Sequence, residues 1–410
     1  MFLDQPPGWY LLLQAVAVPF GNSVTGIRTA MLVIALLGLV AAWAAARALG
    51  GPAAGLGAAA VLAVAPPYPT LAATVESDPP STVLALAAIA LALYARRRPW
   101  LWAASGGMLA LAMSVKLFAV AAGLPILALV IYRRQLQAFL LAAAGFGIVV
   151  LGFVAAYRHV LHEVWQGVVG AHLEARGGHQ PGAESNLSRV LHLPDLHTPF
   201  GWIALAGIAL SLFWLVRGRP LRLWPLWLFT LGALIFTLTM RPLLDHHLVL
   251  LATALAVPAG ASCALSLRRL PLVMARAGVA LFALAVLAGL FQEHRRLARN
   301  DVAEPAGYRW AARTIEARTS PDDLVVSDVP SIPYLAHRRE PGQLIDTSIA
   351  RIVNEYLSPV GVLRELDRSH AVAVVVARNF RSKPAIIRGI AARYPRKLAH
   401  GDVTIYLRAR

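Results

Sequence analysis

Long runs of uncharged, apolar residues follow one another between residues 27 and 291, and they limit what this chain can fold into. Each run is about 15–23 residues long, and short basic clusters separate the runs. A bilayer core of about 30 Å is crossed by roughly 20 apolar residues in a helix, and a helix satisfies its own backbone hydrogen bonds in lipid. We therefore predict an all-α polytopic membrane helical bundle of about ten transmembrane helices, followed by a small C-terminal extracytoplasmic α/β domain. The predicted spans are residues 27–49, 55–75, 79–95, 100–115, 117–132, 136–156, 200–216, 223–240, 248–267 and 277–291.

The charge content agrees with a membrane protein. Only 14% of the 410 residues are charged, whereas a soluble domain has about 25%. The net charge of +17 would suggest a nucleic-acid partner if the chain were soluble. The positions of the charges give a different explanation.

Basic and acidic residues are sorted between alternate connections of the predicted spans. One set of connections carries twelve arginines and no acidic residue, namely Arg47, Arg96, Arg97, Arg98, Arg133, Arg134, Arg217, Arg219, Arg222, Arg268, Arg269 and Arg276. The other set carries every acidic residue before position 292, namely Asp4, Glu76, Asp78, Glu163, Glu174, Glu184, Asp195 and Asp245. Cytoplasmic loops of membrane proteins are enriched in arginine and lysine. We therefore predict that the arginine side is cytoplasmic, that the acidic side and both termini are extracytoplasmic, and that no nucleic acid is bound.

The chain divides into two predicted domains. Residues 1–291 form the transmembrane domain, in which 1–26 is part of a first extracytoplasmic loop and 157–199 is a large extracytoplasmic loop. Residues 292–410 hold 13 of the 21 acidic residues. Apolar runs at 324–326, 371–376 and 403–407 alternate with helical patterns at 304–318, 348–357 and 359–368, which is typical of a small α/β unit.

Three carboxylates at the predicted extracytoplasmic rim are candidate site residues. Glu76 and Asp78 stand two residues apart in front of a span, where they could hold a divalent cation, orient a sugar hydroxyl or act as a base. Asp78 also suits a helix N-cap, because Pro79 follows it. Asp4 precedes two prolines and a short apolar stretch, 11–20, that is too short to span, so Asp4 would be held at the bilayer face.

Cations on the same rim are candidate phosphate ligands. Lys116 is the only lysine before position 383, and it interrupts an otherwise continuous apolar run. Arg241 lies between two spans, and a guanidinium matches phosphate geometry. Arg158 opens the large loop and is a further candidate.

Histidines near the same rim leave open the alternative that the site binds a metal. Asp245, His246 and His247 follow Arg241, and the histidines could bind a metal or transfer protons. Adjacent residues on a helix do not share a face, so we expect that His246 and His247 do not bind one metal together. The histidines of loop 157–199 match no standard ligand spacing. The metal therefore stays unknown.

Several short motifs occur in an order that resembles a known family. They are Asp4-Gln5-Pro6-Pro7 with Trp9-Tyr10-Leu11-Leu12, then Ile27-Arg28-Thr29-Ala30, then Glu76-Ser77-Asp78-Pro79, then Ser114-Val115-Lys116, and finally Arg241 to His247 followed by Leu248-Val249-Leu250-Leu251. This order is similar to the dolichyl-phosphate-mannose-dependent protein mannosyltransferase-like family of the glycosyltransferase-C superfamily, which includes bacterial relatives such as the lipid A aminoarabinose transferases. The resemblance covers about the first 270 residues.

The resemblance implies a glycosyltransferase in the bacterial inner (plasma) membrane. Such an enzyme passes a hexosyl or pentosyl group from a polyprenyl-phosphate lipid to a protein, lipid or glycan acceptor on the extracytoplasmic side. It implies catalytic roles for Asp78, Asp4 and Glu76. The other implied roles are phosphate binding by Lys116, Arg241 and Arg158, and an auxiliary or acceptor role for His246, His247 and Asp245. No cofactor is certain, and a divalent cation is the open option.

Family members also begin with a further transmembrane helix, and an acidic motif after it usually includes the catalytic base. The sequence given begins after that point, so we expect the principal base to be missing from it. A non-catalytic relative is therefore one alternative. A transporter or lipid flippase is another, although the sequence has no clear internal repeat and no acidic residue inside a predicted span.

Overall fold

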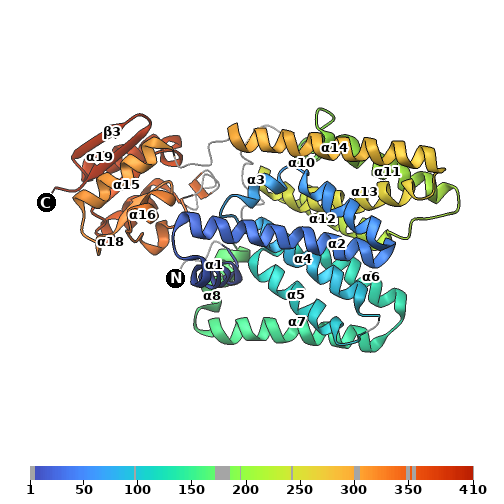
Figure 1. Cartoon of the computed structure of the whole chain (residues 1–410). Helices are drawn as coiled ribbons and strands as arrows, with labels where there is room; N and C mark the ends of the chain where they lie inside the picture. Colours follow the sequence, from blue (N-terminus) through green and yellow to red (C-terminus); the bar gives the residue numbers. More distant parts are fainter. Residues whose placement is uncertain are drawn as a thin grey trace. The chain divides into compact units, whose positions relative to one another are not determined.

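The computed structural model describes residues 5–96, 98–170, 185–193, 195–241, 243–299, 305–347, 351–352 and 357–409 (Figure 1). The described chain forms two compact units. One is a helical bundle made of residues 5–161 and 184–300, and the other contains the tail from residue 301 onward. The division at 291/292 and the extracytoplasmic position of the tail stay predictions.

Apolar helices make up the bundle. Their bounds are α1 (Pro7–Phe20), α2 (Val24–Ala63), α3 (Tyr68–Ala72), α4 (Asp78–Tyr94), α5 (Leu101–Val115), η1 (Leu117–Ala122), α6 (Gly123–Arg133), α7 (Leu136–Tyr157), α10 (Asn186–His192), α11 (Pro199–Val216), α12 (Trp224–Thr239), α13 (Leu248–Leu267) and α14 (Leu272–Arg299). Among the described residues, five helices are long and apolar enough to cross a membrane, and five shorter apolar helices have 10–17 residues. Every predicted span coincides with helical structure, while the number of helices that cross a bilayer stays a prediction.

The first two predicted spans are both found within α2 and α3. The backbone of Gly51 leaves the helical region with φ of +79°, a conformation that suits glycine. The chain reverses there, as two contacts between the arms show. Gly55 packs on Trp43, and the hydroxyl of Tyr68 donates to the carbonyl of Ala35 at 2.6 Å. The two arms of α2 therefore lie antiparallel, as spans 27–49 and 55–75 require.

Helices α4 and α13 are the most buried of the bundle and lie among its other helices. Where α2 crosses α13, a Cβ on either Gly57 or Gly260 would collide with the backbone of the other. Small residues at a crossing allow this close approach, which is how helices associate in lipid.

Helix α14 continues beyond its predicted end at residue 291. It runs to Arg299 and therefore includes Glu293, which is 5% exposed and lies 3.9 Å from Arg296. Glu293 lies outside the predicted span 277–291, so the prediction that no acidic residue lies inside a span stays a prediction. The apolar run was shorter than the helix because a helix end can carry charges into the polar zone next to lipid.

The tail contains a four-stranded sheet in the order β1-β2-β4-β3. Strand β1 (Val325–Ser327) is parallel to β2 (Ala373–Val376), and β4 (Val403–Leu407) is antiparallel to β2 and to β3 (Arg396–His400). One apolar face of the sheet packs on α15 (Ala306–Arg318) and α16 (Ser331–Leu335), and the other on α18 (Pro359–Ser369) and α19 (Pro384–Arg393). Strands β1, β2 and β4 fall on the predicted apolar runs, and β3 is additional. Most of the helix predicted at 348–357 lies outside the described residues.

Candidate functional site

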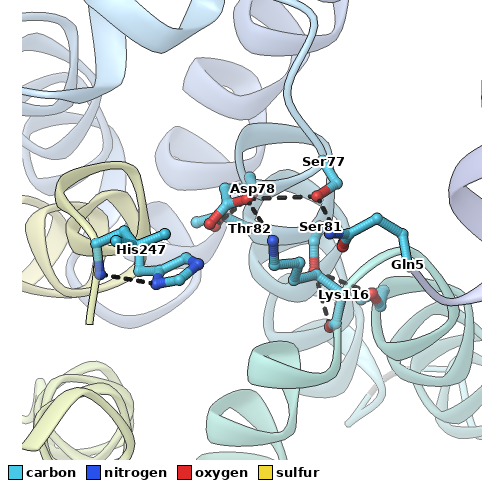
Figure 2. Close-up of polar contacts among 9 residues, drawn as sticks. Gln5, Ser77, Asp78, Ser81, Thr82, Lys116 and His247 are labelled. Carbon is cyan, nitrogen blue, oxygen red and sulfur yellow. Dashed lines mark hydrogen bonds and ion pairs between the residues drawn. The ribbon is translucent and has the colours of Figure 1, made fainter. Parts of the chain in front are cut away.

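An ion pair lies at the start of the central helix α4. Asp78 is the first residue of this helix, Ser77 occupies its N-cap position, and Pro79 and Pro80 fit the first turn. The carboxylate of Asp78 is 0% exposed, and its Oδ2 is 3.0 Å from Nζ of Lys116 (Figure 2). The predicted N-cap role of Asp78 is therefore wrong by one residue, and the side chain points to a cation between α5 and η1.

Lys116 occupies a break in the helical chain. Its backbone is extended, with φ of −155° and ψ of 128°, between the end of α5 and the start of η1. The hydroxyl of Ser81 donates to the carbonyl of Ala112 at 2.9 Å and lies 3.2 Å from that of Lys116, so α4 supports this break. The lysine side chain is only 11% exposed and does not extend freely into solvent. Its burial beside Asp78 favours a specific electrostatic role.

The ion pair leaves acceptor capacity unused. The hydroxyl of Ser77 lies 3.3 Å from Oδ2 of Asp78 and 3.4 Å from Oε1 of Gln5, so its single proton serves one of them at a time. Within the described part of the chain, Oδ1 of Asp78 is buried without a hydrogen-bond partner. A buried carboxylate oxygen without a donor is costly. This oxygen can therefore accept from a further donor or bind a cation.

The helical turn η4 (Asp245–His247) brings two histidines toward Asp78. Candidate ligand atoms of Asp78, His246 and His247 all lie within 4.8 Å of one another. The two rings nevertheless come together, because the tight turn carries both to the same place, with ring centroids 4.2 Å apart. The expectation that His246 and His247 do not bind one metal together stays a prediction. A carboxylate and two imidazoles form a donor set that suits zinc.

The hydrogen bonding of His247 limits the metal hypothesis. Its Nδ1 accepts a hydrogen bond from the backbone N–H of Leu244 at 3.1 Å. A neutral imidazole that accepts at Nδ1 carries its proton on Nε2. This tautomer donates to an anion and would have to lose that proton to bind a metal through Nε2. In the arrangement present, His247 is better suited to an anionic ligand than to a cation.

Glu76 lies in the same electrostatic environment. Burial raises the pKa of the Glu76 carboxyl above its ordinary value, and the neighbouring charge of Asp78 raises it further. His246 and Lys116 act in the opposite direction. A carboxylate with a raised pKa is a stronger proton acceptor. Glu76 is therefore a candidate base, whereas Asp78, which is ion-paired with Lys116, suits a positioning role.

The other predicted site residues lie outside this cluster. Oδ1 of the exposed Asp245 is 3.2 Å from Nη1 of Arg189. Arg241 is exposed after α12, and Arg158 is exposed and donates to Nε2 of His159 at 2.9 Å. Asp4 lies outside the described residues.

The sequence did not single out Gln5 or Arg189. Gln5 lies within a motif that was noted, and its position next to two prolines was the available signal. Arg189 also donates to the carbonyl of Leu243 at 2.8 Å, so it supports the loop that carries the histidines. No sequence pattern links Arg189 to a loop more than 50 residues away.

Packing of α1 on α5 places Gln5 near the cluster. A Cβ on Gly8 would overlap Ser114, so only glycine allows this approach. The contact fixes the start of α1 next to the turn that holds Lys116. The motifs around Gly8 and Ser114 are therefore neighbours in space although about 100 residues separate them.

Residues 4–159 match the family model described as dolichyl-phosphate-mannose-protein mannosyltransferase. None of the curated proteins matches the chain significantly in sequence. Among solved structures, ArnT from Cupriavidus metallidurans in the apo state is similar, with a TM-score of 0.71 and 15% identity over 99% of this chain and 88% of ArnT. ArnT bound to undecaprenyl phosphate gives 0.70, with the same identity and coverage.

An oligosaccharyltransferase from Archaeoglobus fulgidus, in complex with zinc and sulfate, is a more distant match. Its TM-score is 0.56, with 13% identity over 95% of this chain and 61% of the archaeal protein. These likenesses establish the fold. The resemblance to the dolichyl-phosphate-mannose protein mannosyltransferases that the motifs predicted is confirmed, by the family match over residues 4–159 and by an ArnT-like membrane fold over nearly the whole chain.

Proposed function

We propose that this protein is an integral membrane glycosyltransferase that takes a sugar from a polyprenyl-phosphate lipid. The observation that carries the proposal is the buried pair of Asp78 and Lys116, with an unused oxygen on Asp78 and two histidines beside it. The match of residues 4–159 to the mannosyltransferase family supports it. The similar structures of ArnT with undecaprenyl phosphate and of an archaeal oligosaccharyltransferase with dolichol-phosphate support the class of donor lipid.

Lys116 is the proposed ligand of the donor phosphate. The reaction forms a bond between the acceptor oxygen and the anomeric carbon of the sugar, and it breaks the bond between that carbon and the phosphate oxygen. The phosphate leaves with the bonding electrons, so its negative charge grows. A preorganised cation in a site that excludes water stabilises this charge. Asp78 holds Lys116 in position, and His247 can donate from Nε2 to the same anion.

Glu76 is the proposed base. The acceptor hydroxyl loses its proton as its oxygen attacks, and the carboxylate of Glu76 takes that proton. Its raised pKa fits this task, and the neighbouring charges of His246 and Lys116 oppose part of the rise. The proton then leaves to solvent, because Glu76 is only partly buried.

A divalent cation is an optional part of this proposal. Asp78, His246 and His247 would hold it, and it would supply further positive charge next to the leaving phosphate. The proton on Nε2 of His247 opposes this use, and the roles proposed here for Lys116, Asp78 and Glu76 require no metal.

The finer features of the function are also proposals. The acceptor is a protein, lipid or glycan at the extracytoplasmic face of a bacterial inner membrane, and the sugar is a hexose or pentose. The sorting of acidic and basic loops supports the side of the membrane on which Glu76 and Lys116 act.

A transfer assay tests the proposal. Purified full-length protein in liposomes would be mixed with sugar-labelled undecaprenyl-phosphate donors and with bacterial envelope fractions as acceptors. We expect the label to move to an acceptor and undecaprenyl phosphate to be released. If the labelled lipid crosses the bilayer intact without loss of its sugar, the protein is a flippase and the proposal is wrong.

A further inference from the structure

A large cavity lies at the end of the bundle away from Asp78. Its volume is about 1360 Å³, whereas sites for small molecules usually have about 300–1,000 Å³. Leu93 in the last turn of α4 and Arg96 after it line the cavity. Helix α4 begins at Asp78, so a rise of 1.5 Å per residue separates the two sites by about 22 Å or more.

The walls of this cavity are apolar and its rim is basic. Ile208, Leu212, Leu228 and Leu231 are among the side chains of α11 and α12 that line it. The charged residues of the lining are three arginines and no acidic residue, namely Arg96, Arg133 and Arg222. Arg96 and Arg222 lie in two loops and Arg133 ends α6, all on the side predicted to be cytoplasmic. An apolar space with uncompensated positive charge at its edge suits an anionic amphiphile.

The hydrogen bonding of Arg133 independently indicates an anion-binding site. Its guanidinium lies over the ring of Trp102 at 5.3 Å, and its Nη2 donates to the carbonyl of Leu93 at 3.4 Å. Its Nη1 is buried and has no hydrogen-bond partner among the described residues. Arg96 lies close enough to repel it. A buried charged donor without an acceptor is costly, and a phosphate oxygen would satisfy it.

Aromatic side chains place the rim at the level of lipid headgroups. Trp224, Trp227 and Tyr132 line the cavity, and the rings of Tyr132 and Trp224 lie 5.5 Å apart. Tryptophan and tyrosine gather where a bilayer meets water. The apolar depth of the cavity then lies at the level of acyl chains.

We propose that this cavity binds an anionic glycerophospholipid of the cytoplasmic leaflet. Its phosphate contacts Arg133 and Arg222, and its acyl chains lie along α11 and α12. The site is separate from the proposed transfer site and does not depend on transfer chemistry.

Native mass spectrometry of the full chain in mild detergent tests this site. The probes are dioleoyl phosphatidylglycerol, dioleoyl phosphatidylcholine and inorganic phosphate. We expect phosphatidylglycerol to bind in preference to phosphatidylcholine. Arg133→Gln should weaken its binding about tenfold, as expected for the loss of a charge-assisted hydrogen bond. Arg134→Gln is the matched control, because it removes one neighbouring charge outside the cavity lining.

Two further variants keep the test decisive if Arg133→Gln fails to fold. Arg222→Gln should weaken binding while Arg219→Gln should not, because only Arg222 lines the cavity. Leu228→Trp should reduce binding by filling the acyl space. If the variants of lining and control arginines lost lipid binding equally, the lipid would be attracted by general surface charge, and the proposal would be overturned. The proposal would also be overturned if the variants weakened the binding of inorganic phosphate as much as that of phosphatidylglycerol and the protein did not prefer phosphatidylglycerol to phosphatidylcholine.

Discussion

The bundle and the tail each bury an aspartate, but the two carboxylates have opposite hydrogen-bonding states. In the tail, Asp328 is 1% exposed and accepts from the backbone N–H groups of Ala377, Arg378 and Phe380 at 2.7–2.9 Å. In the bundle, Asp78 is 0% exposed and has one oxygen with no hydrogen-bond partner in the described chain. A saturated buried carboxylate is sufficiently explained by structure, whereas one with an unused oxygen next to a buried lysine points to a ligand.

A second pair of acids extends the comparison. Burial raises the pKa of both Glu76 in the bundle and Glu340 in the tail, the latter to about 8. The neighbours differ, because Glu340 accepts from the backbone N–H of Ser327 at 3.2 Å, whereas Glu76 faces the charges of His246, Asp78 and Lys116. Shifts of the pKa in the same direction therefore have different consequences. We expect the raised pKa of Glu76 to affect catalysis and that of Glu340 to affect the stability of the tail.

The largest expected effect is that of Glu76→Gln. Loss of the base should lower single-turnover transfer about 10²- to 10⁴-fold and leave donor binding unchanged. Wild-type activity should rise with pH as Glu76 loses its proton, at a pH above the usual range of a glutamate, and the variant should lack this dependence. Glu340→Gln is the control and should transfer normally. Normal transfer by Glu76→Gln would remove this residue from the mechanism.

Asp78→Asn should have the next largest effect. The change keeps the shape of the side chain but removes the counter-charge of the buried Lys116. We expect a loss of about 100-fold in transfer, because the cation loses its position toward the phosphate. Asp78→Glu should recover part of the activity, whereas a purely structural role would show no such recovery. Thermal unfolding monitored in parallel separates misfolding from mispositioning.

Asp328→Ala should affect stability alone. Three backbone donors lose their acceptor, so the free energy of unfolding of the tail should fall by about 2–4 kcal/mol. Hydrogen exchange in β1 and β2 of the full chain measures this loss. We expect undecaprenyl phosphate to bind as before. If Asp328→Ala lost lipid binding while the hydrogen-exchange protection of β1 and β2 stayed intact, the assignment of a structural role to Asp328 and a ligand-binding role to Asp78 would be contradicted.

Glu340→Gln should have the smallest effect. The pKa of Glu340 is raised in the folded tail, so the folded state keeps a proton that the unfolded state releases above about pH 4.5. Stability is therefore full below that pH and decreases as the pH rises to about 8. The glutamine variant should abolish this decrease and should therefore be more stable than the wild type at pH 8. Hydrogen exchange of β1 at pH 5 and pH 8 tests it, and a pH-independent wild type would contradict it.

Much of the bundle was predictable from sequence, because lipid demands long apolar helices and separates charges by side. Asp78 and Lys116 were identifiable because charges are scarce in this region. Their direct contact was not, since it depends on the break after α5 and on the packing of α4. The approach of His246 and His247 was missed because a tight turn was assumed to behave as an α-helix. Strand β3 was missed because an exposed edge strand that begins with Arg396-Lys397 carries little apolar signal.

Direct binding of undecaprenyl phosphate is the measurement that tests the central claim, which is that Lys116 holds the donor phosphate. The variants are Lys116→Gln and a double variant, Lys116→Gln with Asp78→Asn, called the neutral pair. The neutral pair leaves no buried charge unpaired. Arg134→Gln, at the other end of the bundle, is the control for the loss of one positive charge. We predict that both Lys116 variants bind about 10- to 100-fold more weakly while the control binds normally. Normal binding by the folded neutral pair would contradict the account.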